Sequence, residues 1–170
     1  MKKYIILAIA LCSISSSASA QDSFKEIIKE ATKKAAIDPT TYIPGTVSFV
    51  SQKLDWDSSQ LFFERGFVEK NPVFTLSGKP YDIPVGYGQG MKRITIMSLK
   101  QVGLSYLNNA GAEIMGKFIL KQNPEKKKLV RALIKAEKIA MAVAVSYYIS
   151  EGHFKQWQLN NSMARQMTLR

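Results

Sequence analysis

Few side chains in this chain of 170 residues could carry out acid–base chemistry. His153 is the only histidine, and the carboxylates that could join it in a site are Asp55, Asp57, Glu64 and Glu69. A histidine beside carboxylates can serve as a general base, provided that the fold brings these groups into one pocket. Asp57 also has an ordinary explanation, because Lys53 lies four residues before it on the same helix face. The sequence therefore leaves a hydrolase open as an alternative to a protein without catalysis.

Other signatures of catalysis or metal binding do not accompany these residues. Zinc sites draw on several histidines or cysteines, and no EF-hand spacing is present. No G-x-S-x-G elbow occurs, and the run from Gly86 to Gly90 lacks the lysine of a phosphate loop. We therefore expect no metal and no cofactor, with a magnesium or calcium site built from oxygen ligands alone left open. We interpret the glycine run as a flexible turn that opens the next helix. His153 can also be explained by its expected position at the C-terminal end of a helix, where a protonated imidazole interacts favourably with the helix dipole.

The first twenty residues have the order of segments found in a secretory signal peptide. Two lysines are followed by an apolar run over residues 4–11 and by Ala18-Ser19-Ala20, a small-residue cleavage site. The apolar run is also short of the roughly 20 residues that span a bilayer. We predict an exported protein of the periplasm or cell envelope, with a signal peptide over 1–20 and a single helical domain over 21–170.

The predicted mature chain is strongly basic and has no thiol. Its net charge is +9 instead of +11, because the signal segment holds two lysines and no acidic residue. The segment also contains Cys12, the only cysteine, so no disulfide or cysteine nucleophile is expected within one mature chain. Such charge favours anionic partners, namely lipid headgroups or an acidic envelope component. Nucleic acid is not expected as a partner, because no recognition motif accompanies the charge.

Hydrophobic spacing predicts an all-α fold, a small helical bundle. The expected helices cover about residues 24–36, 46–65, 92–121 and 123–151, and a polar tail over 153–170 reads as a frayed last helix.

Capping residues set the expected boundaries of these helices. Asp38-Pro39 and Pro44-Gly45 should break the chain, so that Thr46 caps the second helix and Gly66 ends it. Asn123, followed by Pro124, should cap the last helix, which Gly152 would end.

Two of the helices carry marked apolar patterns. In the second, Phe49, Trp56 and Phe63 recur every seven residues among other apolar positions on more than one face, which predicts a largely buried helix. The last helix has an apolar stripe that we expect to face the core. Its members are Leu129, Leu133, Ala136, Ala140, Val143 and Tyr147.

Residues 67–90 are rich in proline and glycine, so no long regular element fits there. They also hold many apolar side chains, which predicts an ordered loop lying over the helices. If the protein is an inhibitor or an immunity-type partner of another exported protein, Tyr81–Tyr87 would be the contact with that protein.

One stretch carries a patterned set of polar residues. An aspartate is followed at three and four positions by two serines, and later by a G-x-x-E-x-N-P run. The residues are Asp55, Ser58, Ser59, Gly66, Glu69, Asn71 and Pro72. This pattern over residues 54–72 resembles a family of small helical membrane proteins of unknown function. The resemblance implies a helical architecture and leaves the reaction open. Alternatively, the last three residues form a turn in which side chains bind backbone groups.

The two longest predicted helices raise the question of membrane insertion. Their charge-free runs, 101–112 and 139–150, would each cover about 18 Å of a hydrocarbon core about 30 Å thick. Both a packed bundle and partial insertion remain open.

A basic cluster occupies the first half of the last predicted helix. Its members are Lys126, Lys127, Lys128, Arg131, Lys135 and Lys138. Basic residues beside an apolar stripe suit a helix on anionic lipid. We therefore expect an exported, non-catalytic binding or structural protein associated with the membrane surface.

Overall fold

The computed structural model describes the backbone of residues 18–168 and the side chains of residues 24–167. Its helices are α2 (Ala18–Ile37), α3 (Ile43–Phe63), α4 (Tyr87–Gln122) and α5 (Lys127–Thr168), with short 3₁₀ turns η1 (Pro39–Thr41), η2 (Pro72–Phe74) and η3 (Pro124–Lys126). This architecture confirms the predicted all-α bundle. The predicted signal peptide lies outside the described residues, apart from Ala18–Ala20, which begin α2.

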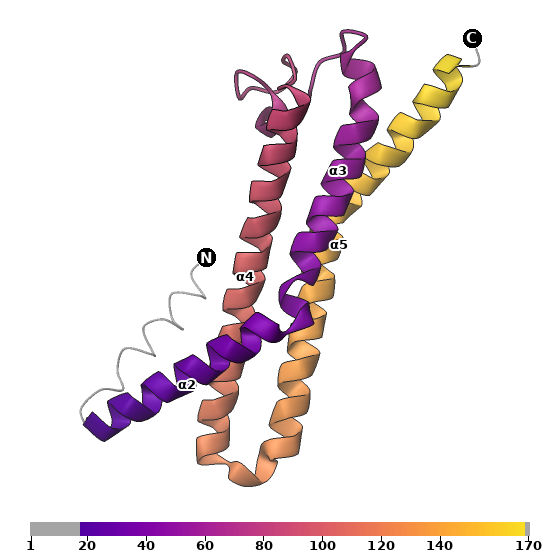
Figure 1. Cartoon of the computed structure of the whole chain (residues 1–170). Helices are drawn as coiled ribbons and strands as arrows, with labels where there is room; N and C mark the ends of the chain where they lie inside the picture. Colours follow the sequence, from indigo (N-terminus) through magenta and orange to yellow (C-terminus); the bar gives the residue numbers. More distant parts are fainter. Residues whose placement is uncertain (1–17, 169–170) are drawn as a thin grey trace.

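The helices form an elongated bundle (Figure 1). α4 and α5 run in opposite directions and are joined through η3 at one end. α3 packs against both of them, while α2 crosses α4 nearer to the turn. Phe24 and Phe118 lie 6.3 Å apart between ring centroids at this crossing, and Lys117 pairs there with Glu30.

The start of α3 differs from the prediction. Asp38 does break the chain, since its carboxylate accepts a hydrogen bond from Thr40 N at 3.0 Å. Pro44, however, lies in the first turn of α3, where a missing N–H costs nothing. Gly45 packs against α4 so closely that an added Cβ would lie 2.4 Å from Val102 Cγ2. The expectation that Pro44-Gly45 breaks the chain and that Thr46 caps the helix was therefore wrong.

The ends of the other helices were predicted with mixed success. α3 stops before Gly66, which has a φ of +83°, and Phe67 N donates to Phe62 O at 3.0 Å, as in a glycine C-cap. α5 does not stop at Gly152 but continues to Thr168. A mid-helix glycine costs about 1 kcal/mol relative to alanine, and contacts made further along the helix offset that cost. Asn123 does not cap the last helix through its side chain.

The loop between α3 and α4 is ordered and covers an aromatic core, as predicted. Backbone pairs join Glu69 to Asp82 and Phe74 to Val85. Phe74 and Val85 are buried against Trp56 and Ile94, with Phe49 and Phe63 packed beside them. The glycine run of the sequence is the first turn of α4 and not a turn before it. Within that turn Gly90 is required, because an added Cβ would lie 2.3 Å from the Trp56 ring.

The burial pattern of α5 is the main departure from the prediction. The stripe expected to face the core is exposed: Leu129 by 58%, Leu133 by 59% and Val143 by 62%. The buried row instead recurs at intervals of four and includes Val130, Lys138, Ala142, Ser146 and Ser150. Small side chains in this row let α5 approach its neighbours closely, as do Ser48 and Ser51 of α3.

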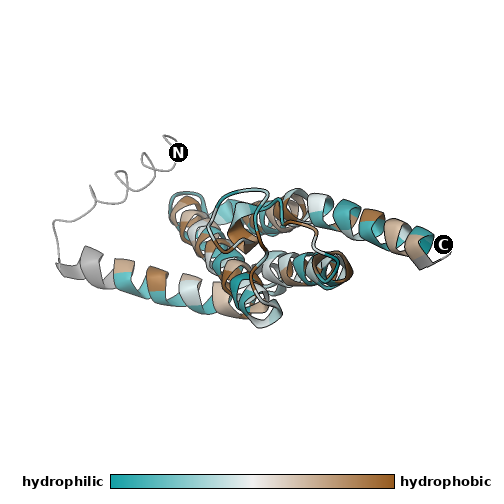
Figure 2. Cartoon of the chain, turned by 90° about the horizontal axis from the view of Figure 1, so that it is seen from above, coloured by the Kyte–Doolittle hydropathy of each residue, from teal (hydrophilic) through white to brown (hydrophobic). Residues whose placement is uncertain are grey.

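Buried polar side chains are also common in the bundle as a whole. Among residues 24–167, eleven buried side chains are polar or charged and ten are hydrophobic. No leucine in that range is buried. Figure 2 shows hydrophobic and hydrophilic residues alternating along the helices. Even so, none of the helices within residues 18–168 combines the length and apolar character that crossing a membrane requires.

Candidate functional site

The residues of the sequence pattern on α3 meet α5 at one place. Asp55 Oδ2 lies 2.7 Å from Nδ1 of His153, and the two side chains are 20% and 23% exposed. The pair joins residues that are nearly a hundred positions apart in the chain. It forms only because α5 continues past Gly152.

The two serines of the pattern also connect α3 to α5 through hydrogen bonds. Ser58 and Ser59 each donate from Oγ to the Asp55 carbonyl at 2.9 Å. Asn160, 3% exposed, donates from Nδ2 to both hydroxyls at 3.0 Å and accepts from Gln156 Nε2 at 2.8 Å. The spacing of three and four residues places both hydroxyls over one carbonyl, where a single buried amide can bind both.

Glu69 and Asn71 form the turn that enters η2. Asn71 N donates to Glu69 Oε1 at 2.6 Å, and Val73 N donates to Asn71 Oδ1 at 3.0 Å. The interpretation of these residues as a structural turn is therefore confirmed. Burial raises the pKa of Glu69, and the nearby Asp55 raises it further, although the backbone N–H of Asn71 acts in the opposite direction.

These groups border a cavity of about 690 Å³ between α3, α5 and the loop that leads into η2. Its polar lining includes Gln52, Asp55, Glu69 and His153. Its apolar lining is mainly aromatic and thioether, contributed by Trp56, Phe62, Phe63, Phe67, Phe74, Tyr148, Met163 and Met167.

Three of the candidate catalytic residues thus converge, but Asp57 does not. Asp57 pairs with Lys53, as the spacing predicted, and accepts a hydrogen bond from Tyr87 Oη at 2.9 Å. It is not among the residues that line the cavity. A hydrolase site would have to work with Asp55, Glu69 and His153 alone.

The geometry of the cavity permits proton transfer and the binding of hydrogen-bond donors. Asp55 holds the His153 ring through Nδ1, which leaves Nε2 as the nitrogen able to exchange a proton. In the part of the chain that the structure describes, His, Cys, Asp and Glu side chains form no group of three or more suited to a metal ion.

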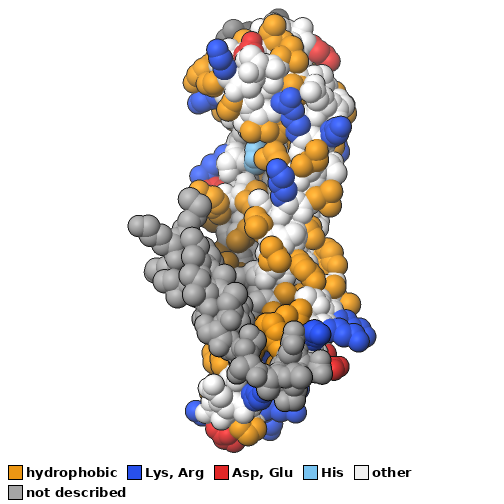
Figure 3. All heavy atoms as spheres, turned by 90° about the vertical axis from the view of Figure 1, so that its left-hand side faces the viewer, with side chains coloured by type: hydrophobic (Ala, Val, Ile, Leu, Met, Phe, Trp, Pro, Cys, Tyr) orange, Lys and Arg blue, Asp and Glu red, His pale blue; other side chains and the backbone are white. Residues whose placement is uncertain are grey.

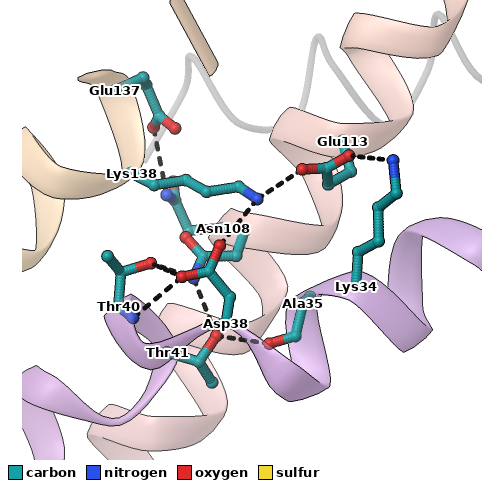
Figure 4. A network of polar contacts seen from close by, with 10 residues as sticks. Lys34, Ala35, Asp38, Thr40, Thr41, Asn108, Glu113, Glu137 and Lys138 are labelled. Carbon is teal, nitrogen blue, oxygen red and sulfur yellow. Dashed lines mark hydrogen bonds and ion pairs between the residues drawn. The ribbon is translucent and has the colours of Figure 1, made fainter. Parts of the chain in front are cut away.

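A second polar cluster joins α2, α4 and α5 (Figure 4), and it lies nearer than the first to the turn between α4 and α5. Lys138, 5% exposed, donates to Asp38 Oδ2 at 3.1 Å and to Glu113 Oε1 at 2.6 Å, and Lys34 lies 3.4 Å from Glu113 Oε2. Asn109 donates to Thr41 Oγ1 at 2.8 Å beside it. Lys138 is therefore enclosed and cannot belong to a surface cluster, whereas the other five residues of the predicted basic cluster are exposed.

At Asp38, Glu113 and Lys138, hydrogen bonds and ion pairs together change the pKa more than burial does. Burial alone would raise the pKa of Asp38 and Glu113, but hydrogen bonds from Thr40 to Asp38 and from Lys138 to both carboxylates leave each pKa below its ordinary value. Burial alone would lower the pKa of Lys138, and its bonds to Glu113 and Asp38 raise it overall. The cluster is thus most stable with all three groups ionised.

Sequence reasoning missed Asn160 and Gln52. Asn160 lies seven residues after His153, a spacing that places both on one face of a helix. That relation is meaningful only if the helix is expected to pass through Gly152. Gln52 lies three residues before Asp55, but a single glutamine next to apolar positions does not by itself predict a site residue.

Comparisons of the chain with protein-family models, curated proteins and solved structures find no match. The resemblance of residues 54–72 to a family of small membrane proteins stays a prediction.

Proposed function

We propose that the protein is an exported, non-catalytic protein of the cell envelope that associates with an anionic membrane surface through the outer faces of α4 and α5. The observation that carries this proposal is the inverted burial of these helices. α4 exposes Leu99, Leu104 and Leu107 by more than 60% each, and α5 exposes Leu129 and Leu133 to a similar degree. Apolar area left in water costs about 25 cal/mol per Å², which an apolar partner would recover.

Charge favours lipid as that partner. Lys126, at the end of η3, and Lys127 and Lys128, at the start of α5, are exposed immediately before Leu129. Arg131 and Lys135 follow on α5. On the face drawn in Figure 3, hydrophobic side chains occur along the length of the molecule, with basic ones among them. Basic and apolar groups arranged together suit the interface of an anionic bilayer.

The proposal is tested by flotation of the chain beginning at Gln21 with vesicles of anionic or of zwitterionic lipid. We expect binding to the anionic vesicles at low salt, and weaker binding as salt screens the lysines. Replacing both Leu129 and Leu133 by Gln should reduce binding at least about tenfold, because two apolar side chains leave the interface.

Leu76→Gln is the matched control, since Leu76 is 61% exposed but lies in the loop before α4. Equal loss of binding in the control and in the double variant would contradict a role for α5. A stable dimer that binds no vesicles would show that a second copy covers these faces instead.

A hydrolase that uses Asp55, Glu69 and His153 is a second candidate, favoured by their convergence on one cavity. In that case His153 would take a proton from water. Turnover of an aryl ester that is lost in His153→Gln and retained in Asp57→Asn would support it. Equal activity in both variants would exclude it.

A further inference from the structure

The cavity between α3 and α5 contains a buried acceptor without a donor. Gln52 is 2% exposed and lines the cavity, and its Oε1 accepts no hydrogen bond from the described residues. The orientation of this amide is set by Ser48, because Nε2 lies 3.2 Å from the Ser48 carbonyl, which can only accept. Buried acceptors rarely remain unpaired. This orphan oxygen indicates a donor that the chain itself does not supply.

The charges that line the cavity favour a cation. Asp55 and Glu69 contribute carboxylates, and His153 is bound to Asp55. Lys70 is the only other charged residue of the lining, and its side chain is exposed. Because the whole chain carries +11, it repels cations at long range. Any preference for a cation must therefore arise from these short-range contacts.

The walls of the cavity suit a cation that carries an apolar group. Trp56 and Phe74 stack with ring centroids 5.1 Å apart and are almost fully buried, so they back the cavity without offering a free ring face. The accessible rings of the lining are Phe67 and Tyr148. Aromatic rings attract cations and bury apolar chains, and the thioethers of Met163 and Met167 add a flexible apolar surface.

We propose that this cavity binds a primary ammonium ion carried on an apolar chain. The ammonium group donates to Asp55 and Glu69, beside the unpaired oxygen of Gln52, and the apolar chain lies against Phe67, Tyr148 and the methionines. Such a group occurs on free amines and in the ethanolamine headgroup of lipids. This site does not depend on the proposed association of α4 and α5 with a membrane.

The test uses hexylammonium as the probe, followed by titration calorimetry and by tryptophan fluorescence. We expect saturable binding at least about tenfold tighter than that of 1-hexanol, because charge-assisted hydrogen bonds are lost in the alcohol. Hexanoate should bind more weakly than either. Equal affinity for hexylammonium and 1-hexanol would overturn the proposal, since the cavity would then be only an apolar hollow.

Two variants locate the binding site. Asp55→Asn should weaken hexylammonium binding at least about tenfold, whereas Asp57→Asn, two residues away and outside the cavity, should leave it unchanged. Glu69→Gln is a second variant that keeps an oxygen for Asn71 N–H, so that the turn is preserved. Unchanged affinity in both Asp55→Asn and Glu69→Gln, with helix content retained, would overturn the proposal.

A competition experiment distinguishes the two sources of the ammonium group. Vesicles with ethanolamine headgroups that displace hexylammonium, where choline vesicles do not, would assign the site to lipid. Saturable binding of hexylammonium without such displacement would assign it to a free amine.

Discussion

Two polar clusters hold α5 in the bundle, and they differ in how their charges are paired. Near the turn between α4 and α5, Lys138 meets both Asp38 and Glu113, so that cation and carboxylates bind one another. Further along α5, Asp55 and His153 form one pair, Glu69 lines the same cavity, and Gln52 beside it keeps an unpaired buried oxygen.

The difference separates a structural role from a binding role. The Lys138 cluster, although it also borders a hollow of about 570 Å³, already contains the partner of each carboxylate. The cavity beside Asp55 retains acceptors that an added molecule could satisfy. Mutations in the first cluster should therefore affect stability most, and mutations in the second should affect binding more than stability.

Replacing Lys138 by Met should have the largest effect on folding. Without the ammonium group, Asp38 and Glu113 remain close together without their shared cation, and breaking a buried pair costs about 3 kcal/mol. Urea unfolding followed by circular dichroism measures the loss. Lys135→Met, at an exposed position one turn away, should change the free energy of unfolding by less than about 0.5 kcal/mol. Similar losses in both variants would contradict a structural cluster at Lys138.

Replacing Asn160 by Ala should have a smaller effect. Ser58 and Ser59 lose a shared donor and Gln156 loses an acceptor, so we expect a cost of about 1–2 kcal/mol in urea unfolding. Asn161→Ala is the control, one residue further along α5. If the Asn161 variant is the less stable of the two, the contacts of Asn160 do not hold α3 and α5 together.

Acid should weaken the Lys138 cluster. Because the pKa values of Asp38 and Glu113 are lowered in the fold, both bind protons less readily than in the unfolded chain. Their contribution is complete above the ordinary values of 3.8 and 4.5 and is lost as the pH falls through the lower folded values. The wild-type protein should lose stability over this range, measured by thermal unfolding, more steeply than Lys138→Met. Parallel pH profiles would contradict this linkage.

Glu69→Gln should have the smallest effect on stability and the opposite sign. The pKa of Glu69 is raised, so its ionised form destabilises the fold at pH above the ordinary value of 4.5. At pH 7 the glutamine variant should be at least as stable as the wild type, and the difference should vanish once the pH falls below the ordinary value of 4.5. A variant that is less stable at pH 7 would indicate that the carboxylate contributes to folding.

The helical fold could be predicted from sequence because capping residues and hydrophobic spacing act locally. Gly66 ends α3 through its positive φ, and the aromatic spacing of α3 identified Trp56 as core. The orientation of α5 could not be predicted in this way. The expectation that the leucine stripe faces inward fails for α5, because Lys138 and Asn160 find their partners on the inner face instead. The site was half predicted, because Asp55 and His153 were candidates but their contact depends on helix continuation through Gly152.

The inverted burial of α5 can be measured directly with a nitroxide label on cysteine, in the chain that begins at Gln21 and so lacks Cys12. Leu133→Cys would carry the label on α5, and Leu76→Cys, similarly exposed in the loop, would carry the control. With anionic vesicles present, the account predicts that the label at position 133 becomes more accessible to oxygen and less accessible to a water-soluble relaxing agent, while the label at position 76 stays in water. Equal aqueous accessibility at both positions, with and without vesicles, would contradict association of the outer face of α5 with the membrane.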